Sequence, residues 1–101
     1  MIVIAGRAKI HAAQLEDARR AGSVMAATSR DEPGCVDYRF AIDIDDPLVV
    51  QVFEQWESAA ALEAHFATPH FQAFSEVILH AVDGPAEFTR YEISSAGPLF
   101  G

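Results

Sequence analysis

Four histidines are the side chains best suited to transfer protons near neutral pH: His11, His65, His70 and His80. Only His65 is predicted to point inward, because it follows Leu62 by three residues and precedes Phe66. We interpret it either as a buried histidine with one hydrogen bond or as the base or substrate contact of a pocket. Since a helix break at Thr68 separates His65 from His70, their rings need not converge on a metal ion. No metal site is predicted.

Aromatic and acidic residues on two expected strands are further candidates. Trp56 closes one strand and either fills the core or lines a ligand pocket. Tyr38 could donate a hydrogen bond to a phenolic ligand, although the alternation of its strand also fits a packed face. Glu54 lies between apolar neighbours, so an inward-facing carboxylate would need a partner such as Arg39 or Arg90.

The elements that must position these residues follow from hydrophobic periodicity. Alternating or β-branched runs predict strands, and apolar residues spaced by three and four predict helices. Ser58 and Thr68 are expected helix N-caps, with Pro69 at the first helical position. The expected order is strand 2–10, helix 12–30, strands 35–44 and 48–57, helical segments 59–66 and 69–83, and strand 86–93. This β-α-β-β-α-β order predicts an α+β, ferredoxin-like fold with an antiparallel sheet, in a single domain over residues 1–101.

Apolar residues on both faces of several strands indicate that the sheet is covered on both sides. Helices would cover one face, and the sheet of a second copy would cover the other. We therefore expect a homodimer. Residues 94–101 are expected to be mobile or to form an arm onto the partner.

Charge and cysteine content restrict the classes of partner. Fifteen acidic residues against seven basic ones give a formal charge of −8, which disfavours nucleic acid and anionic membranes. The single cysteine, Cys35, can form no disulfide within the chain, and we interpret it as an inert thiol rather than a nucleophile. Residues 1–5 are too short an apolar stretch for a signal peptide, so a cytoplasmic location is expected.

Several motifs together resemble the antibiotic biosynthesis monooxygenase (ABM) family, in particular its quinol monooxygenase branch. The resemblance extends from Ile2 to about Ile93, and the block from Glu54 to Phe74 is the most specific. The motifs are Glu32-Pro33-Gly34-Cys35 with Tyr38, Phe53 to Ser58, Ala61 to His65, and Thr68 to Phe74. The resemblance implies a dimeric α+β barrel. It disfavours the haem-degrading branch, because the chain lacks asparagine and has His65 and Ser75 where that branch has its Trp and His.

The resemblance implies a cofactor-independent monooxygenase that oxidises a small phenolic or quinol-type aromatic substrate with O₂. Triplet oxygen accepts electrons singly, so the protein must deprotonate an electron-rich substrate and exclude water. We expect His65 to be the base and Arg39 or Arg90 to hold the oxyanion. The apolar cavity is expected from four aromatic residues: Trp56, Tyr38, Phe66 and Phe74. The alternative is a non-catalytic dimer that binds an aromatic or haem-like small molecule.

Overall fold

A computed structural model of the protein describes all 101 residues. The elements, in chain order, are β1 (Ile2–Lys9), η1 (Ala12–Gln14), α1 (Leu15–Arg30), β2 (Cys35–Ile42), β3 (Val49–Trp56), α2 (Ala59–Phe66), α3 (Pro69–Ala81) and β4 (Glu87–Glu92). All the expected strands and helical segments are present, with small differences at their ends.

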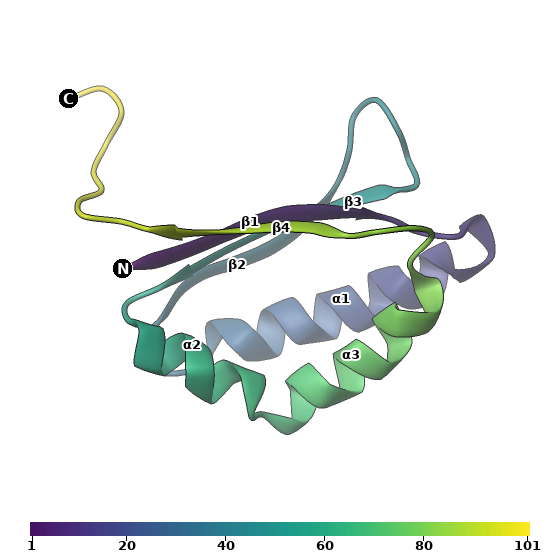
Figure 1. Cartoon of the computed structure of the whole chain (residues 1–101), viewed down its shortest axis with the longest axis horizontal. Helices are drawn as coiled ribbons and strands as arrows, with labels where there is room; N and C mark the ends of the chain where they lie inside the picture. The colour runs from purple at the N-terminus through teal and green to yellow at the C-terminus, as the bar shows by residue number, and fades with distance from the viewer.

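The four strands form one antiparallel sheet in the order β2-β3-β1-β4. The helices all lie on one face of this sheet, and its other face is open (Figure 1). This arrangement confirms the predicted ferredoxin-like α+β fold. In the register, Glu54 of β3 pairs with Tyr38 of β2 and with Ile4 of β1, so these three side chains face the helices together.

Two predicted boundaries were too generous. The strand expected to reach Ile44 ends at Ile42, because the Asp43 carboxylate accepts the backbone N–H groups of Asp45 and Asp46 at 2.8 and 3.2 Å. Such a side-chain turn competes with the strand ladder. The helix expected from Ala12 starts as the short η1 turn. Both predicted N-caps are confirmed: Ser58 accepts the N–H of Ala61, and Thr68 accepts that of Phe71.

The turn between α1 and β2 brings distant parts of the chain together. Gly34 has φ +83°, a conformation that side chains disfavour, and a Cβ there would lie 2.6 Å from Ala61 Cβ on α2. The carbonyl of Gly34 also accepts the N–H of Glu57 at 2.8 Å. Close packing of this turn on α2 places Glu32 beside the α2–α3 junction.

The core lies between the helices and the sheet. Its main cluster is Ile2, Met25, Ala26, Tyr38, Val52, Trp56 and Leu62. In contrast, every residue of β4 is exposed. Only 14 of the 101 residues are buried, which leaves the open face and β4 available for a further contact. No helix is both long enough and apolar enough to cross a membrane.

Candidate functional site

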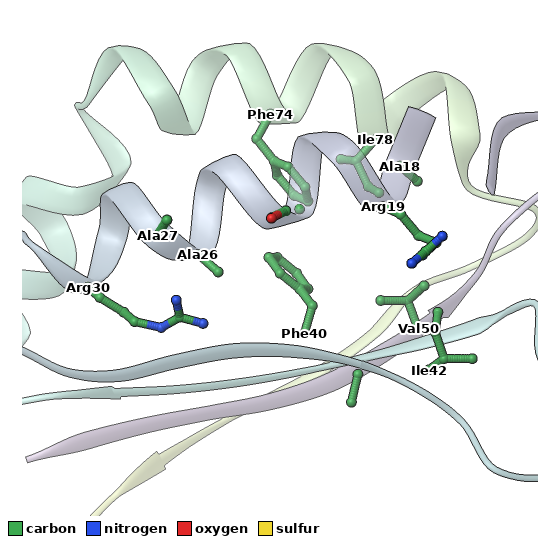
Figure 2. A pocket seen from close by; sticks show the side chains of 13 residues that line it. Ala18, Arg19, Ala26, Ala27, Arg30, Phe40, Ile42, Val50, Phe74 and Ile78 are labelled. Atoms are coloured by element: carbon green, nitrogen blue, oxygen red, sulfur yellow. The ribbon is translucent and has the colours of Figure 1, made fainter. Parts of the chain in front are cut away.

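A cavity of about 420 Å³ lies between α1, α3 and the β2–β3 half of the sheet. Phe40 from the sheet and Phe74 from α3 point toward each other across it (Figure 2), with ring centroids 5.3 Å apart and an interplanar angle of 31°. Nine of its 13 lining residues are hydrophobic. An apolar cavity with an aromatic pair and a few polar groups is typical of a site for a small aromatic molecule.

Small residues on α1 create this space. Ala18, Gly22 and Ala26 recur at four-residue spacing, so they lie on one face of the helix above the sheet. A Cβ at Gly22 would already lie 3.4 Å from the Phe40 ring. Larger residues along this face would therefore close the cavity.

Two arginines flank the aromatic pair: Arg30 lies toward one end of the cavity and Arg19 toward the other (Figure 2). Arg19 is held by Glu16 at 2.9 Å. Arg30 donates from Nε to the carbonyl oxygen of Tyr38 at 3.0 Å. None of the residues lining the cavity is acidic or a histidine, so its wall carries positive charge in a protein that is acidic as a whole.

Outside the cavity, Glu32, His65 and His70 form a polar cluster at the junction of α2 and α3. Glu32 Oε2 accepts hydrogen bonds from His65 Nδ1 at 2.6 Å and from His70 Nε2 at 2.8 Å. The carboxylate can only accept, so His65 carries its proton on Nδ1. Burial lowers the pKa of His65, although Glu32 opposes that shift. The neutral imidazole is therefore favoured at neutral pH.

Beside this cluster, Glu54 is buried with a hydrogen-bond donor on its carboxylate. Trp56 donates from Nε1 to Glu54 Oε1 at 3.0 Å, and Tyr38 lies next to Glu54 on the neighbouring strand. Burial raises the pKa of Glu54 and also that of Tyr38. The expectation that an arginine would pair with Glu54 is wrong. The Trp56 indole satisfies the carboxylate from two positions along the same strand.

The comparisons with known proteins agree with this architecture. The profile of the family described as Antibiotic biosynthesis monooxygenase matches residues 1–77. The chain belongs to the antibiotic biosynthesis monooxygenase family. It is 35% identical over 98 residues to an uncharacterized protein of Synechocystis, covering 97% of this chain and 67% of that protein.

One further sequence relative and one solved structure are also similar to this ABM domain. The probable quinol monooxygenase YgiN of Escherichia coli is 40% identical over 62 residues, covering 54% of this chain and 60% of YgiN. A solved structure from Deinococcus radiodurans, assigned to the antibiotic biosynthesis monooxygenases, superposes with a TM-score of 0.89. It is 24% identical, and both chains are covered in full. This second likeness concerns the fold.

Glu32, His65 and His70 form the one group in this ABM domain with the donors for a metal ion, since their ligand atoms lie within 4.8 Å of one another. The two rings thus converge across the helix break, which the sequence spacing did not require. A metal on His65 Nδ1 would, however, move its proton to Nε2, which is buried without any partner. Histidine ligands almost always donate their other N–H to a fixed acceptor. The cluster therefore fits a hydrogen-bonded clamp better than a metal centre.

The structure brings together only some of the residues that the sequence singled out. His65 and Trp56 are each fully buried, and their rings lie 4.7 Å apart. Tyr38 contacts both rings, with centroids 5.4 Å from His65 and 6.3 Å from Trp56. None of these three side chains lines the cavity. Tyr38 instead packs against Phe40, which does, at 5.6 Å.

The other expected site residues are dispersed. Phe74 lines the cavity, whereas Phe66 does not: it is 41% exposed and packs against His65, with ring centroids 5.9 Å apart. Arg39 lies on the open face of the sheet and contacts Asp37 at 2.9 Å. Arg90 is on β4 beside Glu92. Neither arginine lines the cavity.

Sequence reasoning did not identify Phe40 and Arg30. Phe40 shares the strand parity of Tyr38, so the alternation of β2 already contained its signal. Arg30 ends α1, where a basic residue is ordinarily explained by the helix dipole. Cys35 fits its expected inert state, because burial raises the pKa of its thiol to about 11.

Proposed function

We propose that this ABM-family protein is a cofactor-independent monooxygenase that oxidises a small phenolic or quinol-type substrate with O₂. The observation that carries this proposal is the cavity between α1, α3 and the sheet, in which Phe40 and Phe74 face each other. A planar ring fits beside two aromatic side chains whose preferred contacts are offset or tilted. The name of the YgiN relative, a probable quinol monooxygenase, supports the same substrate class.

The chemistry requires little of the protein beyond ionising and enclosing the substrate. A phenolate donates one electron to O₂, and the resulting phenoxyl radical and superoxide combine at a ring carbon. Loss of water from the peroxide leaves a quinone carbonyl. Overall, a phenol and O₂ give a quinone and water, and each product receives one of the two oxygen atoms of O₂. The apolar wall would protect the radical pair from water.

His65 is the base expected from the sequence, and replacing it tests that role. In the structure, Tyr38 and Phe40 lie between its ring and the cavity, so we propose that it acts by positioning Tyr38 and Trp56. A base role predicts a loss of turnover of about 10² to 10⁴-fold in His65→Ala. A positioning role predicts a smaller loss that His65→Gln partly restores, because glutamine can still donate to Glu32.

The proposed test of the site is oxygen uptake by chelator-treated protein with a panel of hydroquinones and polyphenols. Ser23 lines the cavity, so Ser23→Phe should fill it and reduce uptake to the autoxidation background. The matched control is Val24→Phe, since Val24 is 64% exposed and lies outside the cavity. Uptake that is equal in the wild type and Ser23→Phe would place the reaction elsewhere.

A second candidate function is binding without catalysis. It is favoured by one observation: no carboxylate or imidazole lines the cavity to act as a general base. This candidate predicts saturable binding of an aromatic ligand, lost in Ser23→Phe, without oxygen uptake above background.

We also propose that the protein acts as a homodimer. Large apolar side chains remain exposed on both faces of β4 and on the open face of the sheet, among them Phe88 at 59% and Phe53 at 38%. Monomeric proteins rarely leave such a surface in water. A second copy packed on the open face would cover it, with residues 94–101, which continue past the end of β4 on the side away from the helices (Figure 1), as an arm onto that copy.

A further inference from the structure

Arg30 differs from every other basic side chain of the protein. Each of the other six Lys and Arg side chains lies within 3.9 Å of a carboxylate oxygen. Arg30 has no such acidic partner, although acidic residues outnumber basic ones by fifteen to seven. A cation without an anion in so acidic a chain is available for a negatively charged group from outside.

The position of Arg30 directs that charge toward the cavity. Its Nε–H is anchored on the Tyr38 carbonyl at 3.0 Å, which fixes the plane of the guanidinium group. In Figure 2 the guanidinium group lies between α1 and the sheet, on the side of Phe40. The terminal N–H groups remain for a ligand, and arginine pairs strongly with oxyanions.

The charged surroundings of Arg30 favour an anion inside the cavity rather than outside it. Glu32, Glu54 and Asp37 act with Arg30 on the neighbouring Cys35 thiol, but none lines the cavity or lies in contact with the guanidinium group. The remaining charge on the wall is Arg19, which Glu16 already neutralises. An anionic ligand would therefore meet no carboxylate on the cavity wall.

From this geometry we propose that Arg30 binds the ionised oxygen of a phenolic ligand whose ring lies beside Phe40 and Phe74. The inference rests on the proposed function and names the form in which the substrate binds. The phenolic proton passes to solvent water at the exposed end of the site, so no side-chain base is needed. Arg30 thereby takes the oxyanion role that the sequence assigned to Arg39 or Arg90.

A chromophoric phenol tests this without any turnover. With 4-nitrophenol, whose anion absorbs in the visible, absorbance titrations of the free and protein-bound probe report the pKa of the phenol directly. We expect the bound pKa to lie about one unit below the free value, equivalent to tenfold tighter binding of the anion. Arg30 is exposed, and screening by water limits the shift.

Three variants of α1 and its end sharpen the result. Arg30→Gln should abolish the shift in the pKa of the bound phenol. Arg30→Lys should keep part of this shift, because lysine retains the positive charge but lacks the paired N–H donors of the guanidinium group. Arg20→Gln is the matched control, since Arg20 lies on the same helix, outside the cavity, and is exposed. Its bound probe should titrate as in the wild type.

The outcomes separate this proposal from the proposed function. A bound phenol with an unchanged or raised pKa, no saturable binding of the anion, or an equal shift in Arg30→Gln would each overturn the role of Arg30. A shift that depends on Arg30, without oxygen uptake by any panel substrate, would keep that role and reject the oxygenase. Oxygen uptake that falls about tenfold in Arg30→Gln at a pH below the substrate pKa, but less above it, would support both.

Discussion

At the scale of single residues, the shared carboxylate of Glu32 is the most informative feature. It accepts hydrogen bonds from two imidazoles that come from different helices, with His65 fully buried. Replacing Glu32 would leave the Nδ1–H of the buried His65 without its acceptor, which costs about 1–3 kcal/mol. The cluster therefore ties the α1–β2 turn to the α2–α3 junction, beneath the wall of the cavity.

The buried His65 predicts a pH dependence of stability. Burial lowers its pKa in the folded state below the ordinary value of 6.5, so the unfolded chain binds a proton more readily. The contribution of the neutral His65 to the free energy of unfolding is complete above about pH 7. It is lost as the pH falls from the unfolded pKa of 6.5 toward the lower pKa of the folded state. Denaturant unfolding at pH 7.5 and 5.5 should show a larger loss for the wild type than for His65→Gln.

Two controls make that comparison specific. His80→Gln removes an exposed histidine from α3, and it should lose as much stability on acidification as the wild type. The raised pKa of Glu54 acts in the opposite direction at lower pH, but it is common to all three proteins and cancels in the difference. Equal pH dependence in the wild type and His65→Gln would show that burial does not perturb this imidazole.

At the scale of elements, hydroxyl caps start both α2 and α3, and the second cap separates the two helices. Ser58 accepts the N–H of Ala61 at 3.1 Å. Thr68 accepts the N–H of Phe71 at 3.2 Å and donates to the carbonyl oxygen of His65 at 2.7 Å. Thr68 therefore starts α3 and closes α2 at once, which sets the angle that brings His65 and His70 to Glu32.

This double role predicts unequal effects of two similar substitutions. Ser58→Ala should reduce the free energy of unfolding by about 1 kcal/mol. Thr68→Ala should cost about 1 kcal/mol more, because the hydroxyl bond to the His65 carbonyl is lost as well and only backbone N–H donors remain there. Thr28→Ala on the exposed side of α1 should be neutral or slightly stabilising. Equal costs at Ser58 and Thr68, measured by urea unfolding, would contradict the bridging role of Thr68.

At the scale of the whole molecule, one face of the sheet has no covering layer (Figure 1). The two-layer arrangement buries 14 of 101 residues and leaves β4 exposed on both sides. A chain of this length has a small core, so burying more apolar surface against a second copy would add stability. The proposed homodimer would make unfolding depend on protein concentration.

The open face predicts which substitution separates the subunits. Phe53→Glu places a charge in the centre of that face, opposite Ala5 and Arg39 in the register. We expect it to convert a dimer into a monomer at micromolar concentration, as measured by light scattering. Ile44→Glu is the control, because Ile44 is fully exposed in the β2–β3 connection, and its mass should match the wild type. A monomeric wild type would remove the dimer.

Local chemistry in the sequence was enough to determine the elements and their order. Period-two and helical spacing, two N-caps and a Pro-Gly turn each act within a few residues, and the structure has them where they were expected. The resemblance in motifs such as Glu54 to Phe74 likewise identified the family, which residues 1–77 confirm. The predicted strand end at Ile44 was too late, because a turn formed by the Asp43 side chain ends β2 at Ile42.

Only the tertiary structure decided which chemical groups meet. Glu32 reaches His65 across 33 residues of chain, and the Phe40–Phe74 pair joins a strand to a helix. Periodicity predicts the face of a helix or strand on which a residue lies. It does not predict which residues of other elements pack against that face. The unpaired state of Arg30 is likewise a property of all its neighbours together, so it became visible only when the folded chain placed every carboxylate.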